Sequence, residues 1–256
     1  MAVAHELPHN YLLAELSLEE RNRLFPHLQL VAMPLGKVLY EPGDLLCHIY
    51  FPVDCIVSLL YVMEDGASAE ISVVGNDGVI GVALFMGGET TPSRAIVQSA
   101  GYAYQLDSQR LKDEFHRNGG LQNSLLRYTQ ALITQMSQTA VCNRHHSVDQ
   151  QLCRWLLLSL DRLSSNQLVM TQELIANILG VPCEGVADAT SELQKLNVIA
   201  YAHGQITVLD RPRLEHLSCE CYGVMKKETD RLRSRQAMSF EVMTRQTNPD
   251  LAPARC

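Results

Sequence analysis

The sequence predicts an α+β fold in three parts: an N-terminal antiparallel β-roll of double-stranded β-helix or jelly-roll type, one long helix, and a C-terminal winged helix-turn-helix. Short β-rich runs between Pro-Gly and Asp-Gly turns fill the stretch from Leu28 to about Leu106. A run of 26 residues without Gly or Pro follows over 121–146. The pattern then becomes helix, helix, turn, helix and hairpin.

Length and charge limit the classes of protein that the chain can belong to. At 256 residues it exceeds the usual size of one domain. We divide it into a β-roll (1–118), a long helix (119–146), a winged helix-turn-helix (147–217) and a basic, partly disordered tail (218–256). The net charge of -7 excludes a nonspecific nucleic-acid binder, which depends on a large positive field.

The start of the chain and its cysteines indicate a cytoplasmic protein with no membrane partner. The first residues lack a basic segment followed by an apolar one, and the longest apolar run, near "VIGVALFM", is too short to span a bilayer. The eight cysteines are scattered through a chain too large to need disulfides.

The first twenty-odd residues predict one short amphipathic helix. Ser17 and Glu20 have the spacing of a capping box. Four leucines follow the helical period: Leu12, Leu13, Leu16 and Leu24.

The long helix carries an apolar stripe at steps of three and four residues. Its members are Leu121, Leu125, Tyr128, Leu132, Met136 and Ala140. A helix of this length extends roughly 39 Å, more than a small barrel needs as a cover. We therefore expect the stripe to contact the same helix of a second subunit, with packing on its own barrel as the alternative.

The C-terminal elements follow from capping and turn residues. Ser147 and Gln150 form a second capping box, which begins a helix. A short strand "LVM" and a helix capped by Thr171 come next, and Gly180 makes the turn to a helix over 182–196. A hairpin with the loop His203-Gly204 closes the unit.

The order of these parts resembles the Crp/Fnr family of bacterial transcription regulators over roughly residues 10–222. The most specific stretches are "TQELIANILGV", "ATSELQKLNVIAYAHGQITVLD" and "GNDGVIGVALFMGGETTPSRAIVQSAG". The resemblance implies a cytoplasmic homodimer whose β-roll is a cyclic-nucleotide-binding-like sensor. It also implies a palindromic DNA operator, RNA polymerase as a partner, and a hinge near 145–147 that re-aims the DNA-reading helices.

The family's cyclic-nucleotide site is altered in this sequence. Gly81 is kept, but Val82 stands where a ribose-binding Glu is expected, and Arg94 falls one residue later than the phosphate-binding Arg. A one-residue slip on a strand turns a side chain to the other face. We therefore predict that the β-roll senses something other than a cyclic nucleotide or transmits a partner's signal, with an anion bound by Arg94 as the alternative. The family's N-terminal iron–sulfur cluster is not supported, because the first cysteine is Cys47.

The DNA-reading helix has an unusual charge. Family members often have Arg-Glu-x-x-x-Arg at its start, whereas this chain has Cys183, Glu184 and Asp188. Losing one bidentate base contact costs roughly 1–3 kcal/mol of discrimination. Candidate DNA contacts are Thr171, Gln172, Cys183, Glu184, Ala187, Asp188, Lys195 and His203. The basic tail is either a further anchor or a solvated helix followed by disorder. The alternative function is a degenerate module that binds a ligand or partner with weak or no specific DNA binding.

Two patterns suggest metal chemistry. Cys142, His145 and His146 lie at helical spacing, and Cys219 and Cys221 complete a soft-ligand set if the chain folds back; packing is the alternative role. The segment "HELPH" matches a zinc-protease motif, but Pro8 breaks the required helical turn. No other catalytic pattern occurs, so we expect no enzymatic activity.

Overall fold

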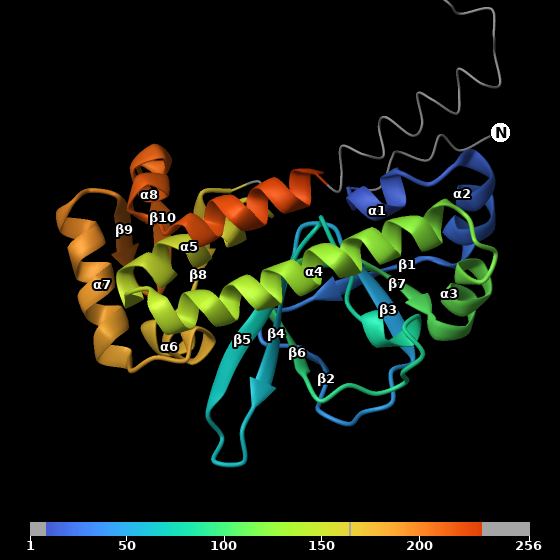
Figure 1. Cartoon of the computed structure of the whole chain (residues 1–256), viewed down its shortest axis with the longest axis horizontal. Helices are drawn as coiled ribbons and strands as arrows, with labels where there is room; N and C mark the ends of the chain where they lie inside the picture. The colour runs from blue at the N-terminus through green and yellow to red at the C-terminus, as the bar shows by residue number, and fades with distance from the viewer. Residues whose placement is uncertain (1–8, 164, 232–256) are drawn as a thin grey trace, which may run out of the picture.

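The structure is a computed structural model that describes residues 9–163 and 165–231. One large hydrophobic core lies within the N-terminal β-domain, and a second lies within the C-terminal helical domain. Figure 1 shows the long helix α4 (Gly120–His145) crossing between these two bodies. The predicted α+β architecture is confirmed.

The N-terminal segment forms two short helices, α1 (Tyr11–Ala14) and α2 (Leu18–Leu24), and the 3-10 turn η1 (Phe25–His27). The prediction of one helix was wrong because Ser17 has an extended backbone and caps α2. The capping box with Glu20 is present, and the four predicted leucines are buried. Most of the "HELPH" motif lies outside the described residues.

Two antiparallel sheets form the β-roll. One has the order β1-β7-β3 and the other β2-β6-β4-β5. Their strands are β1 (Gln29–Met33), β2 (Val38–Tyr40), β3 (His48–Pro52), β4 (Ile56–Val62), β5 (Ser68–Val74), β6 (Arg94–Ser99) and β7 (Gly101–Asp107). The turn η2 (Val82–Leu84) follows β5, and α3 (Ser108–Phe115) leads from β7 to α4.

The apolar stripe of α4 packs on its own β-roll. Leu121, Leu125 and Leu132 are buried in the β-roll core, and Tyr128 and Met136 pack against it. The expectation that this stripe contacts a second subunit was therefore wrong, because the stripe is buried where α4 covers one face of the β-roll. Ala140, the last member of the predicted stripe, is exposed.

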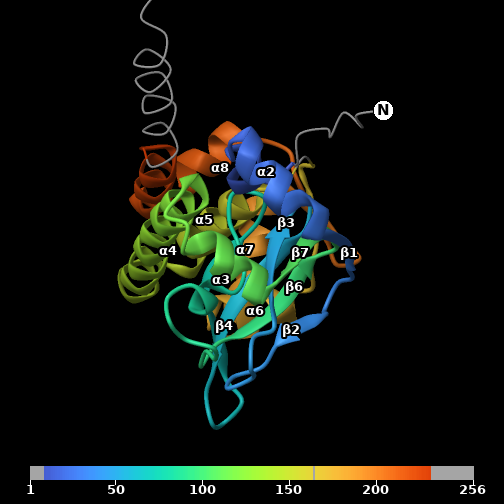
Figure 2. The same ribbon diagram turned by 90° about the vertical axis from the view of Figure 1, so that its right-hand side faces the viewer.

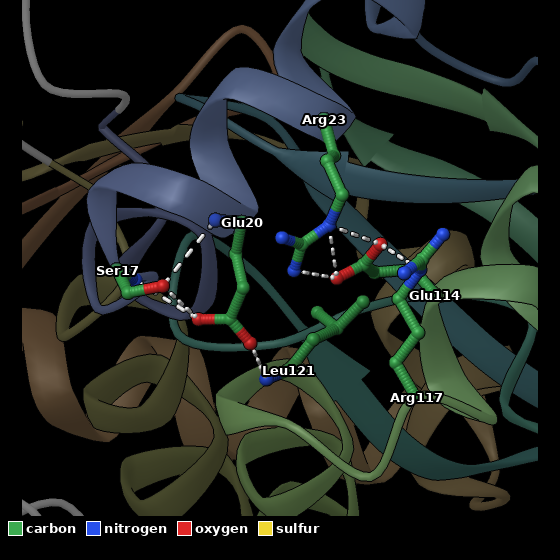
Figure 3. A network of polar contacts seen from close by, with 6 residues as sticks. All are labelled: Ser17, Glu20, Arg23, Glu114, Arg117 and Leu121. Carbon is green, nitrogen blue, oxygen red and sulfur yellow. Dashed lines mark hydrogen bonds and ion pairs between the residues drawn. The ribbon is translucent and has the colours of Figure 1, made fainter.

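The beginning of α4 is capped by a side chain from another helix. Gly119, at the N-cap, offers no side chain for this purpose. Glu20 of α2 instead accepts a hydrogen bond from the Leu121 N–H at 3.0 Å through Oε1, while its Oε2 accepts from the backbone and hydroxyl of Ser17. Figure 3 shows this carboxylate between the two helix starts, beside the ion pair of Arg23 with Glu114.

The C-terminal domain is a winged helix-turn-helix around the buried Trp155. Its elements are α5 (Val148–Leu160), β8 (Gln167–Val169), α6 (Gln172–Leu179), α7 (Cys183–Lys195), β9 (Ile199–Ala202), β10 (Gln205–Val208) and α8 (Arg211–Leu217). The strands form a sheet of order β8-β10-β9. The capping box of Ser147 and Gln150 is present as predicted.

The segment predicted as a basic tail begins as an ordered helix over 220–231. It is helical because Tyr222 and Met225 are buried in the C-terminal core. The helix lies beside α4, to which Glu228 is joined by a hydrogen bond from Gln130 at 3.5 Å. Figure 1 shows this helix running away from α7. Lys226 Nζ donates to the Tyr222 hydroxyl at 3.2 Å within it. Two other tail cations, Arg233 and Arg235, lie outside the described residues.

The two domains pack directly on each other. Ile56 and Val73 of the β-roll belong to the same buried cluster as Trp155. Arg162 pairs with Asp77 at 2.9 Å across this interface. Figure 2 views the molecule at right angles to Figure 1 and shows α4 along one side of the β-roll. Within the described ranges, no helix has the length and apolar composition needed to cross a membrane.

Candidate nucleic-acid interface and β-roll cavity

The turn between α6 and α7 depends on Gly180. This residue has φ 67° and ψ 37°, a left-handed conformation that glycine adopts without strain. Its N–H donates to the carbonyl of Ala176, which closes the end of α6. Across the turn, Gln172 Nε2 donates to Thr190 Oγ1 at 2.9 Å. These contacts fix the angle between the two helices.

The wing, which is the hairpin of β9 and β10, contacts both α7 and the segment before α6. The Tyr201 N–H donates to Gln194 Oε1 at 2.7 Å, and the Met170 N–H donates to the carbonyl of Gly204 at 2.6 Å. His203 and Gly204 form the tip with φ of 53° and 73°, as a two-residue hairpin turn of type I′ requires. The predicted hairpin loop is therefore in place.

The outer surface of α7 is acidic. Glu184 and Asp188 are exposed, and Lys195 is 3.4 Å from Glu192 in an exposed ion pair. Cys183 is half-buried against the C-terminal core, and Ala187 is half-buried. The structure thus presents carboxylates where the family resemblance implied cations.

The predicted contact residues at the start of α6 have roles within the fold. Thr171 is the N-cap, and its hydroxyl accepts from the Leu174 N–H at 3.2 Å. Gln172 is engaged with Thr190, as described above. Sequence reasoning missed Thr190 and Gln194 as positioning residues, because their partners lie 18 and 7 positions away and no local pattern marks them.

A cavity of about 210 Å³ lies between the β-roll and α4. Gly81 and Val82 line it, as does Met136 of α4. Most of its other lining side chains are aliphatic, and hydroxyls come from Tyr40, Tyr61, Thr91 and Ser93. None of the described residues that line it is charged. Gly81 has φ 107°, and a Cβ there would lie 3.3 Å from the carbonyl oxygen of His48.

Arg94 does not line this cavity. On β6 the neighbouring Ala95 is buried, whereas Arg94 is on the other face of the strand and only partly buried. Its Nε pairs with Glu41 Oε2 at 2.7 Å. The structure places Arg94 where strand alternation predicted and supplies a carboxylate that neutralises it.

The soft-ligand residues are brought together, with one exception. The sulfurs of Cys142, Cys219 and Cys221 and a ring nitrogen of His146 lie within 4.8 Å of one another. His145 is exposed and stays outside the group.

Two sequence models of known domains match the chain. The cyclic nucleotide-binding domain matches residues 30–118, and the Crp-like helix-turn-helix domain matches residues 150–217. Together they cover more than half of the chain in the order found in Crp/Fnr regulators. The chain belongs to the Crp/Fnr family of transcriptional regulators.

Solved structures share the fold of this family member. A Eubacterium rectale protein assigned to the Crp/Fnr family is 16% identical, with 81% of this chain and 97% of that chain covered and a TM-score of 0.62. FixK2 from Bradyrhizobium japonicum is 16% identical, with 75% and 98% covered and a TM-score of 0.62. The c-di-GMP-responsive regulator CLP of Xanthomonas campestris is 15% identical, with 76% and 100% covered and a TM-score of 0.59. No curated protein matches the sequence.

Proposed function

We propose that this Crp/Fnr protein binds palindromic DNA as a homodimer and that its β-roll responds to a ligand other than a cyclic nucleotide. The observation that carries the DNA proposal is the fully built turn and wing, with Gly180 and the His203-Gly204 tip in left-handed conformations. A module that no longer bound specific DNA would not require this turn and wing geometry. The bound dimer would act on transcription through contact with RNA polymerase.

The acidic surface of α7 affects both the affinity and the salt dependence that we expect for DNA binding. Glu184 and Asp188 repel phosphates, so the nonspecific, salt-dependent share of binding is small. Glu184 can accept a hydrogen bond from cytosine N4, which gives sequence preference without a cation. We therefore propose binding of modest affinity with a shallow salt dependence.

The test begins with selection of bound duplexes from a random DNA pool by the purified full chain. Fluorescence anisotropy then compares the selected duplex with a scrambled one across salt. We expect at least about 10-fold tighter binding of the selected duplex, since one missing bidentate contact leaves most of a typical specificity ratio intact. No binding below roughly tens of micromolar at low salt would contradict the proposal and favour a module that binds a partner or ligand.

The charge argument is tested with the double variant Cys183→Arg and Asp188→Arg. We expect tighter binding to the scrambled duplex and a steeper salt slope, by about one unit for each new phosphate contact. Gln109→Arg with Asp113→Arg is the matched control, because it makes the same charge change on exposed positions of α3. Equal effects of both pairs would show that net charge, not α7, controls binding.

The sensor proposal follows from the cavity between the β-roll and α4. Its lining offers hydroxyls and aliphatic groups, and the candidate cation Arg94 is paired with Glu41 and does not line it. A cyclic phosphate would be buried there without a counter-charge, which is strongly unfavourable. An uncharged, largely apolar ligand fits the lining. Calorimetric titration with cyclic AMP and cyclic GMP should show no micromolar binding, and such binding would overturn this part of the proposal.

A further inference from the structure

Three buried cysteines and a histidine meet where α4 ends and the helix over 220–231 begins. Cys142 lies in the last turn of α4, and His146 is its C-cap. Cys219 and Cys221 lie at the entry to the C-terminal helix. The three cysteines form a hydrophobic cluster of their own, separate from both large cores. Packing of either domain core therefore does not explain why thiols gather here.

The four ligand atoms have the spacing of a metal site. Cys142 Sγ is 3.5 Å from Cys219 Sγ, and Cys221 Sγ is 3.5 Å from His146 Nδ1. All four atoms lie within 4.8 Å of one another. In a tetrahedral site with Zn–S near 2.3 Å and Zn–N near 2.1 Å, adjacent ligand atoms are about 3.5–3.8 Å apart. A disulfide between two of the cysteines would leave the third thiol and the histidine unexplained.

We propose that Cys142, His146, Cys219 and Cys221 form a tetrahedral Zn²⁺ site. Three sulfurs and one imidazole nitrogen are a ligand set typical of structural zinc, which is four-coordinate with no open position. On binding, the cysteines coordinate as thiolates, and their protons are released to solvent.

The orientation of His146 provides independent support. Its Nε2 lies 3.2 Å from Glu220 Oε2, which leaves Nδ1 directed at the sulfurs. A metal-bound histidine usually donates its other ring N–H to a carboxylate in this way. Gln138 Nε2 also donates to Cys221 Sγ at 3.1 Å, as an outer hydrogen bond to a thiolate would require.

One feature near the site favours thiolates. Arg154 is buried and places its positive charge near Cys142, where it offsets the negative charge of the ligands.

The site joins both ends of the DNA-reading domain to α4. That domain spans 147–217, so His146 lies just before it and Cys219 just after it. A metal bound to all four residues would hold these two ends together against Cys142 and limit how the domain can turn on α4. This consequence for DNA reading rests on the proposed function, whereas metal binding itself does not.

The test uses the full chain, reduced and stripped of metal with a chelator, and titrated with Co²⁺ as a spectroscopic substitute for Zn²⁺. We expect one equivalent per chain, the intense visible bands of tetrahedral cobalt with thiolate-to-cobalt charge transfer, and displacement by Zn²⁺. Absence of stoichiometric binding, or a spectrum of octahedral cobalt, would overturn the proposal whether or not the protein binds DNA.

Variants locate the site. Cys221→Ser should abolish the tetrahedral cobalt spectrum, while His145→Ala and Cys47→Ser should leave it unchanged, because His145 and Cys47 are exposed and outside the group. Glu220→Gln, at an exposed position, should weaken Zn²⁺ binding about 10–100-fold. Equal binding by Cys221→Ser and the unaltered chain would overturn the assignment.

A measurement on the unaltered chain covers the case in which a cysteine variant fails to fold. Zn²⁺ should protect Cys142, Cys219 and Cys221 from alkylation, as read by mass spectrometry, and leave Cys47 reactive. Uniform reactivity with and without Zn²⁺ would contradict the site.

Discussion

At the scale of single residues, Glu20 shows how one carboxylate can stabilise two helices. Its two oxygens accept hydrogen bonds from Ser17 at the start of α2 and from Leu121 at the start of α4. We expect Glu20→Gln to lower the free energy of unfolding by about 1–2 kcal/mol, since an amide replaces one acceptor with a donor. Urea denaturation of this variant and of Glu19→Gln, an exposed neighbour, measures the difference. Equal losses in both would contradict the capping role.

The same carboxylate gives a pH dependence of known sign. Burial alone would raise the pKa of Glu20, but hydrogen bonds from Leu121 and Ser17 outweigh it and hold that pKa below the ordinary 4.5. A group with a lowered folded pKa stabilises the protein above its unfolded pKa and loses this contribution as pH falls through the folded value. Unfolding measured below pH 4.5 should therefore show a decline with falling pH that is weaker in Glu20→Gln.

At the scale of elements, α4 carries a second apolar stripe that its own domain does not cover. Leu126, Ile133 and Ala140 repeat every seven residues and are all exposed. Seven-residue spacing is the repeat of helices that pack as a coiled coil. We propose that this outer stripe, not the buried one, contacts α4 of a second copy.

Ile133→Glu tests this dimer contact. A charge at the centre of the stripe should shift the purified chain from dimer to monomer in analytical ultracentrifugation, because burying it unpaired is unfavourable. Leu30→Glu is the control, because Leu30 is an exposed aliphatic residue like Ile133 but lies on β1 and not on α4. A monomer without any substitution, or an unchanged dimer in Ile133→Glu, would contradict the contact.

Helical periodicity could therefore predict that α4 has a buried stripe, but not which surface buries it. The stripe that contains Leu121 and Leu132 packs on the β-roll because the chain topology places the β-roll beside α4. Local residue spacing does not encode that topology. Strand alternation did place Arg94 correctly, since it needs only the parity of neighbouring positions. Sequence spacing could not predict which of His145 and His146 joins the cysteines, because this depends on where α4 ends. His146 follows the last residue of α4 and has an extended backbone, which directs its ring to the cysteines.

At the scale of the whole molecule, the two domains meet through a surface that is only partly apolar. Ile56 and Val73 join the core around Trp155, but Glu70 of β5 is buried in the same region. Gly180, at the turn of the DNA reader, lies so close to β5 that an added Cβ would be 3.2 Å from that of Ala69. A change in the packing of β5 would therefore act directly on the turn between α6 and α7.

Glu70 makes this interface sensitive to pH. Burial raises its pKa to about 7, against the opposing charges of Arg154 and Arg162. A raised folded pKa contributes stability below the unfolded value of 4.5, and this contribution is lost as pH rises through about 7. The free energy of unfolding should fall by up to about 3 kcal/mol between pH 5 and pH 8 through this group. Glu70→Gln keeps the shape without the charge, so denaturation curves of the variant should lose this decline and show the larger stability at pH 8. Parallel pH profiles for the variant and the unaltered chain would show that Glu70 stays ionised in the interface.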